Sequence, residues 1–112
     1  MQLLILILKK VERMEKLIEN LAKSGVSGGT ILEGTGMAQE LMNMEELPMF
    51  GMLRRILSDE EKEPCKVMMF VLRDEQVVTT RETIKKVVGD FSAPNTGIMF
   101  SIPITYVEGL GE

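Results

Sequence analysis

The stretch Leu3-Leu4-Ile5-Leu6-Ile7-Leu8 is an unbroken aliphatic run, and Lys66-Val67-Met68-Met69-Phe70-Val71-Leu72 is a second apolar run in the other half of the chain. The first run, which has no alternating polar residues, is typical of a strand that lies in the middle of a sheet with both faces buried. A charged amphipathic stretch and then a short β-like segment follow each run. The order strand, helix, strand therefore occurs twice.

The two amphipathic stretches have the spacing of helices. In the first, apolar residues recur at helical spacing from Val11 to Leu21, and Gly25 ends the pattern. In the second, the spacing predicts a helix over 74–88, and Gly89 ends it. Each predicted helix therefore connects two predicted strands.

The closing strands are predicted over 30–33 and 97–104, and Pro103 indicates that the second lies at a sheet edge or ends there. Two strand-helix-strand halves in one short chain predict an α+β fold. Specifically, we predict a ferredoxin-like βαββαβ sandwich, in which two helices cover an antiparallel sheet.

Length and composition are those of one folded domain, which we assign to residues 1–112. The 112 residues suffice for one hydrophobic core, and the 45% hydrophobic and 27% charged content excludes a disordered chain. The net charge is −4, with acidic and basic residues interspersed. Because there is no basic field to neutralise phosphates, we expect no nucleic-acid partner.

The single cysteine and the apolar run near the N-terminus give information about the cellular compartment of the protein. Cys65 is the only cysteine, so it forms no intramolecular disulfide, and its place beside a predicted strand favours a buried thiol. The run Leu3–Leu8 is too short to span a bilayer. It also lacks the basic region and the cleavage site of a signal peptide. We therefore expect a cytoplasmic protein.

The connection between the halves, residues 34–64, is far longer than an ordinary loop, which has roughly 4 to 6 residues. Two pieces of it, 38–47 and 49–57, have helical spacing and are separated by Pro48. Each piece would present an apolar face. Because an apolar face on an extruded segment requires a partner, we expect function to reside in this long loop.

Residue types exclude several chemistries. The chain has no histidine, which removes Ser-His and Cys-His catalysis and imidazole metal ligands. The thioether groups of the methionines in the long loop are soft ligands of the kind that binds Cu(I). We favour the interpretation that these methionines form an adaptable hydrophobic surface. The glycine-rich stretch 33–37 has backbone N–H groups for an anion, yet a plain turn is favoured. We predict no catalytic and no metal site.

The order of segments and several motifs resemble the PII-like superfamily, to which nitrogen regulatory protein PII belongs. The passage Gly25-Val26-Ser27-Gly28-Gly29-Thr30-Ile31 is similar to that family's Gly-Ile/Val-Thr/Ser-Gly-x-Thr-Val. The closing Gly97-Ile98-Met99-Phe100-Ser101-Ile102-Pro103-Ile104 is similar to its Gly-Lys-Ile-Phe-x-x-Pro-Val. The resemblance implies a trimeric signalling protein, not an enzyme, with a long T-loop that engages regulated partners.

The resemblance also implies two groups of functional residues. A small effector, such as an adenine nucleotide, would bind between subunits, and a regulated membrane transporter or enzyme would bind the long loop. The expected effector-binding residues are Thr30, Gly34, Gly36, Met37, Gln39, Gly97 and Ile98. The expected partner-binding residues are Met42, Met44, Met49, Phe50, Met52, Arg54 and Arg55.

The chain departs from the family pattern where phosphates would bind. Ile98 occupies the position of the family's lysine, and the segment after Tyr106 contains no arginine. Each missing cation removes a charge-assisted hydrogen bond of roughly 1.5 to 3 kcal/mol, so the classical phosphate contacts are missing. Tyr106 is the only tyrosine, so the modified tyrosine of the family's T-loop is also missing.

Three alternatives remain open from the sequence. The first is a metal-responsive trimer like the CutA proteins, which share this architecture. The second is a small enzyme with a carboxylate base in the cleft between subunits. The third is a structural role, in which the apolar faces of the long loop pack on the trimer or pair with a second trimer.

Overall fold

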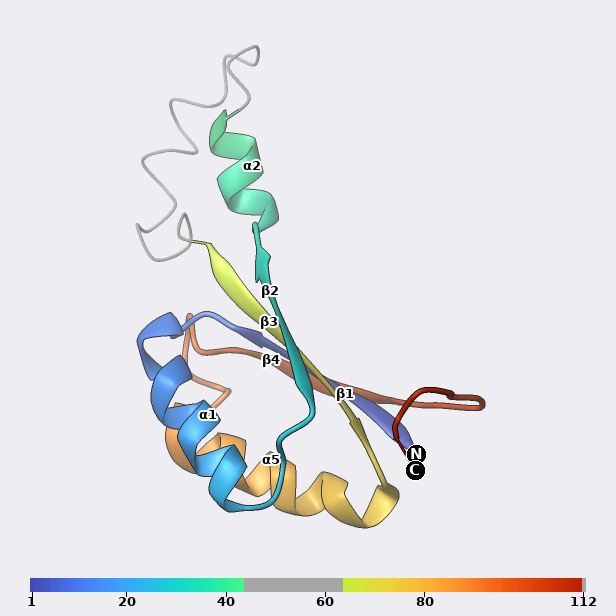
Figure 1. The fold of residues 1–112 in the computed structure, drawn as a ribbon. Helices are drawn as coiled ribbons and strands as arrows, with labels where there is room; N and C mark the ends of the chain where they lie inside the picture. Colours follow the sequence, from blue (N-terminus) through green and yellow to red (C-terminus); the bar gives the residue numbers. More distant parts are fainter. Residues whose placement is uncertain (44–63, 112) are drawn as a thin grey trace.

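The computed structural model describes residues 1–43 and 64–111. Within them, four strands form one antiparallel sheet in the order β2-β3-β1-β4 (Figure 1). This is the strand order of a ferredoxin-like α+β sandwich. The strands are β1 (Gln2–Leu8), β2 (Gly29–Gly34), β3 (Cys65–Leu72) and β4 (Gly97–Pro103).

Two helices cover one face of this sheet. They are α1 (Met14–Lys23), preceded by the short 3-10 helix η1 (Val11–Arg13), and α5 (Asp74–Val88). Both lie on the same side of the strands in Figure 1, and they pack against each other. The third helix, α2 (Met37–Asn43), extends from the end of β2 beyond the sheet.

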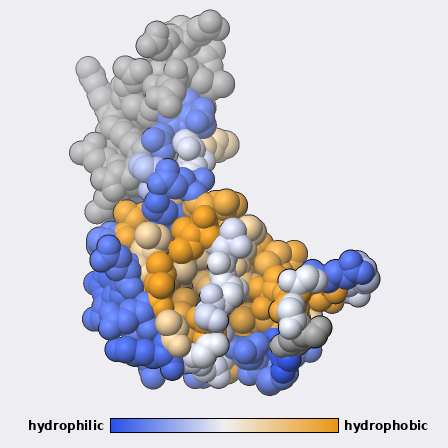
Figure 2. All heavy atoms as spheres, viewed as in Figure 1, coloured by the Kyte–Doolittle hydropathy of each residue, from blue (hydrophilic) through white to orange (hydrophobic). Residues whose placement is uncertain are grey.

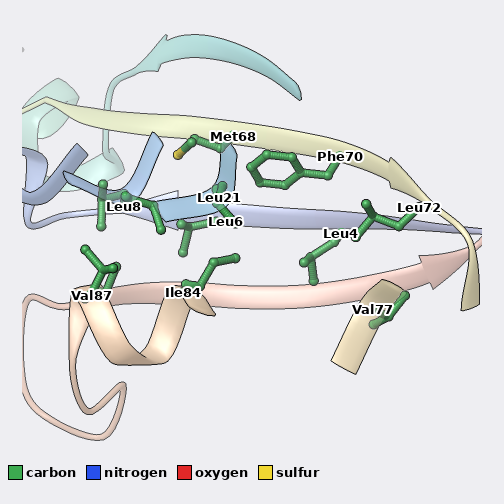
Figure 3. Close-up of a cluster of buried hydrophobic side chains, with 12 residues drawn as sticks. Leu4, Leu6, Leu8, Leu21, Met68, Phe70, Leu72, Val77, Ile84 and Val87 are labelled. Atoms are coloured by element: carbon green, nitrogen blue, oxygen red, sulfur yellow. The ribbon is translucent and has the colours of Figure 1, made fainter. Parts of the chain in front are cut away.

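The core lies between the sheet and the two covering helices. Alternate residues of β1, namely Leu4, Leu6 and Leu8, are fully buried and point toward α5, where Ile84 and Val87 face them (Figure 3). The apolar stripe of α5 has the i, i+3, i+4 spacing that packs a helix onto a core. Each of these leucines contributes about 2 kcal/mol of burial free energy.

The expectation that β1 is buried on both faces is wrong for a single chain. β1 does lie in the middle of the sheet, between β3 and β4, but Leu3, Ile5 and Ile7 are only half-buried. The physical reason is that both covering helices lie on the other face. We call the uncovered face the open face, and the strand registers place there Leu3, Ile5, Ile7, Leu32, Val67, Met69, Val71, Ile98, Phe100 and Ile102.

The predicted strands, the predicted helix over 74–88 and the predicted burial of Cys65 are confirmed where the structure describes the chain. The predicted helix over 74–88 matches α5, the other predicted strands match within two residues, and Cys65 is buried. Part of the predicted helix over 38–47 is present as α2, whereas the predicted helix over 49–57 lies outside the described residues. In the described part of the chain, no helix has the length and apolarity needed to cross a membrane.

Candidate functional site

The expected effector residues fall into two groups at the same end of the sheet. Gly34 ends β2, Gly36 and Met37 lead into α2, and Gly97 begins β4. The register aligns these positions, because Leu8 lies opposite both Lys66 and Gly97, and Lys66 lies opposite Glu33. The end of β2 and the start of β4 therefore lie at the end of the sheet where β1 finishes (Figure 1).

The two groups nevertheless lie on opposite edges of that sheet. β3 and β1 separate β2 from β4, and three strand spacings amount to roughly 14 Å. One chain therefore does not gather Gly36 and Gly97 around a single small ligand through their backbones. A site containing both groups requires either a long side chain that spans the gap or a second copy of the chain.

Two expected effector residues do not join these groups: Thr30 lies away from this end of the sheet, and Ile98 lies on the open face. Thr30 lies four residues before Gly34, a distance of about 13 Å along a strand, and lines a different hollow with Gly25 and Gly28. Ile98 lies on the open face beside Ile7 and is 59% exposed. The structure thus places Thr30 apart from the Gly34–Gln39 group.

Lys9 is a polar residue at this end of the sheet that the sequence analysis missed. Its backbone N–H donates to the carbonyl oxygen of Thr96 at 3.1 Å, which ties it to the start of β4. Its ammonium lies 3.4 Å from the point where a Cβ at Gly36 would stand, next to α2. Among the described residues, no ion pair involves Lys9. Lys9 therefore brings an unpaired positive charge into the gap between the two groups.

Further polar groups lie just before β4, in α2 and beside Lys10. The hydroxyl of Thr96 is buried without a hydrogen-bond partner among the described residues, and so is the side-chain oxygen of Gln39. Lys10 lies beside Asp90, whose pKa is held below its ordinary value chiefly by the Ser92 N–H and to a smaller extent by Lys10. Buried polar groups without partners are costly, so they mark places where a ligand or water completes the bonding.

The glycines at this end have identifiable structural roles. A Cβ at Gly34 would lie 2.9 Å from the sulfur of Cys65, and a Cβ at Gly97 would lie 2.5 Å from the carbonyl oxygen of Ile7. Gly97 also has a φ of +148°, a conformation that side chains rarely adopt. Both glycines therefore allow close packing of neighbouring strands, whatever else they contact.

Glu33 and Lys66 form an ion pair at the same end, between β2 and β3. The ammonium of Lys66 donates to the Glu33 carboxylate at 2.6 Å and lowers the pKa of that carboxyl. Because the folded-state pKa is depressed, this pair stabilises the fold above the unfolded-state pKa. The contribution disappears as the pH falls through the folded-state pKa.

This ion pair gives a first testable prediction. In an NMR titration of the side-chain carboxyls, we expect Glu33 to titrate below the ordinary pKa of a glutamate, and the Lys66→Met variant to return it to that value. A Glu33 pKa that is unchanged by Lys66→Met would show that the pair does not form in solution.

The described residues offer no other obvious chemistry. No group of three or more histidine, cysteine, aspartate or glutamate side chains that could hold a metal ion lies within them. Met37 is exposed at the start of α2. The expected partner residues Met44, Met49, Phe50, Met52, Arg54 and Arg55, and the side chain of Met42, lie outside the described part of the chain.

One signal in the sequence pointed to Lys9. Lys9 follows directly on the aliphatic run, at the end of a central strand, where a charged side chain must leave the core. The proximity of Lys9 to Gly36 could not be predicted, because it depends on the pairing of β2 with β3. Comparison with known proteins adds no further constraint, since no family model and no curated protein matches the chain.

Proposed function

We propose that this protein is a PII-like regulatory protein, a homotrimer without enzymatic activity. In this proposal a small effector binds between neighbouring copies and alters the long segment that begins at Gly34. The altered segment then changes its affinity for a regulated partner, such as a membrane transporter or an enzyme. The observation that carries the proposal is the division of the candidate site between two opposite edges of one sheet.

The open face supports the trimer. Its side chains are almost all apolar, and Leu32, Phe100 and Ile102 are each more than two fifths exposed in a single chain. Figure 2 shows apolar residues gathered over the strands, whereas the surface over α1 is hydrophilic. An apolar patch that includes ten residues of a four-stranded sheet is unusual for a monomer and typical of an assembly interface.

Assembly would also complete the candidate site. If β4 of one copy lies beside β2 of the next, Gly97 of the first approaches Gly36 and Gln39 of the second. Lys9 would then supply a positive charge at the junction. This charge would replace that of the family's lysine, whose position Ile98 occupies in this chain. Because α2 begins directly after Gly36, a ligand held there would favour one arrangement of the segment that follows.

The structure supports a specific ligand preference. Adenine nucleotides are the ligands that the family resemblance implies, but at the end of the sheet where Gly36 and Gly97 lie the described cations are Lys9 and Lys10, whereas Arg81 and Lys85 line the hollow between β4 and α5. With few cations available, added phosphates should contribute little to the affinity. We therefore expect ATP, ADP and AMP to bind with dissociation constants that differ by less than about tenfold, equivalent to about 1.4 kcal/mol.

Calorimetric titration of the purified protein with ATP, ADP and AMP tests this proposal. We expect saturable binding, and a dissociation constant raised about tenfold in the Lys9→Gln variant, because a charge-assisted contact is lost. Lys16→Gln, which removes a lysine from the exposed face of α1, is the matched control and should leave binding unchanged. Absence of heat with all three nucleotides would contradict the nucleotide assignment.

A further inference from the structure

A hollow of about 650 Å³ lies at the end of the sheet where β1 begins, opposite the end that carries Lys9. Its apolar lining comes from open-face residues of the two central strands, Leu3 on β1 with Met69 and Val71 on β3. Thr30 on β2 and the loop 25–28 also line it. A volume of several hundred Å³, with apolar walls and a few polar groups, is typical of a small-molecule site.

The chain returns to this hollow after β4. Pro103 ends β4 opposite Gln2, and the backbone N–H of Ile104 donates to the carbonyl oxygen of Met1 at 3.0 Å. The segment that follows turns back toward the N-terminus (Figure 1), and Leu110 joins the lining of the hollow. We call residues 104–111 the strap.

The strap extends from one edge of the sheet toward the other. It starts at β4, whereas Thr30 belongs to β2, which lies three strand spacings or about 14 Å away. Residues 104–110 reach up to about 23 Å when extended. The strap is therefore long enough to bring Leu110 into the same hollow as Thr30.

Leu110 is the apolar side chain that the strap brings to the hollow. It is 43% exposed, so more than half of its surface is covered, although the strap contains no helix or strand. The glycines on both sides, Gly109 and Gly111, have φ values of +91° and +78°. Glycine adopts this left-handed conformation readily, so the backbone bends on each side of Leu110. The strap thus presents one leucine to the hollow between two bends.

We infer that the strap is an autoinhibitory lid. Leu110 occupies part of the hollow in the resting chain, so a molecule that binds beside Thr30 must first displace it. A lid held by one partly covered leucine yields to a ligand that binds only the open state, and the ligand loses part of its affinity in opening the lid. The inference requires neither the trimer nor the nucleotide proposed above, because the strap and the hollow belong to one chain.

Methyl NMR tests whether the lid is closed in solution. With labelled methionine and threonine methyl groups, Leu110→Ser should shift the signals of Met69 and Thr30, because the leucine in their hollow is removed. Val78→Ser is the matched control, since Val78 is 50% exposed on α5 and lies outside this hollow. It should leave both signals in place. Signals of Met69 and Thr30 that do not respond to Leu110→Ser would overturn the inference.

Binding of the apolar dye anilinonaphthalene sulfonate tests whether the lid limits access to the hollow. The Leu110→Ser variant should bind the dye about fivefold more tightly than the wild type, because its hollow is open in every molecule. Val78→Ser should bind it as the wild type does. Equal dye affinity in the wild type and Leu110→Ser would overturn the inference.

Failure of the proposed function gives a different pattern of results. If ADP produces no heat with the wild type, the nucleotide assignment is contradicted. The NMR and dye measurements still support or overturn the lid in that case, because neither of them uses a nucleotide.

Discussion

Replacing Gly97 with alanine is expected to lower the free energy of unfolding by about 3 kcal/mol, a large part of the stability of a domain this size. Two independent causes add here. The new Cβ would lie 2.5 Å from the carbonyl oxygen of Ile7, so β1 and β4 must move apart. Alanine also adopts a φ of +148° only with strain. Urea denaturation followed by circular dichroism measures the loss.

Gly28→Ala is the matched control for this prediction. Gly28 precedes β2, no atom lies within 4 Å of the point where its Cβ would stand, and its φ is not in the positive region. This substitution should change the unfolding free energy by less than about 0.5 kcal/mol. If both glycine variants were equally stable, the close approach of β4 to β1 at Gly97 would be wrong.

Replacing Ile5 with lysine is expected to raise the dissociation constant of the trimer by at least about a hundredfold. Ile5 lies at the centre of the open face, between Met69 on β3 and Phe100 on β4. In the proposed trimer the open faces of three copies meet, and burying an ammonium among apolar side chains costs several kcal/mol. In a single chain the same lysine would extend into water, so the monomer should remain folded.

Thr79→Lys provides the control for the Ile5 variant, because it places the same charge on an exposed position of α5. Sedimentation equilibrium over a range of protein concentrations should show a trimer for Thr79→Lys and a folded monomer for Ile5→Lys. A trimer of undiminished affinity in the Ile5 variant would exclude the open face from the interface. Loss of the circular dichroism spectrum instead would mean that Ile5 is needed within the chain itself.

Much of the fold could be predicted because local patterns and the sheet agree. The aliphatic runs define β1 and β3, and the apolar spacing and Gly89 define α5, whose observed bounds equal the predicted ones. Pro103 correctly indicated an edge strand. The burial of β1 on both faces could not be judged in this way, because an uninterrupted apolar run has the same sequence whether a helix layer or another copy covers it.

The candidate site was less predictable. Motif resemblance selected Gly36 and Gly97, but it carried no information on their separation by two strands. Lys9 was missed because its nearness to Gly36 depends on strand pairing, which the sequence does not show directly. Thr30 was grouped with Gly34 by the motif, whereas the extended backbone of β2 places it far from the end of the sheet.

Native mass spectrometry of the purified protein with ADP tests most directly whether the effector site lies between copies of the chain. The account predicts a complex of three times the 12.6 kDa chain mass that carries up to three bound ADP molecules. It also predicts a monomeric Ile5→Lys variant that carries none, since one chain holds only part of each site. A monomeric wild-type protein, or monomers of the variant that bind ADP as tightly as the wild type, would contradict it.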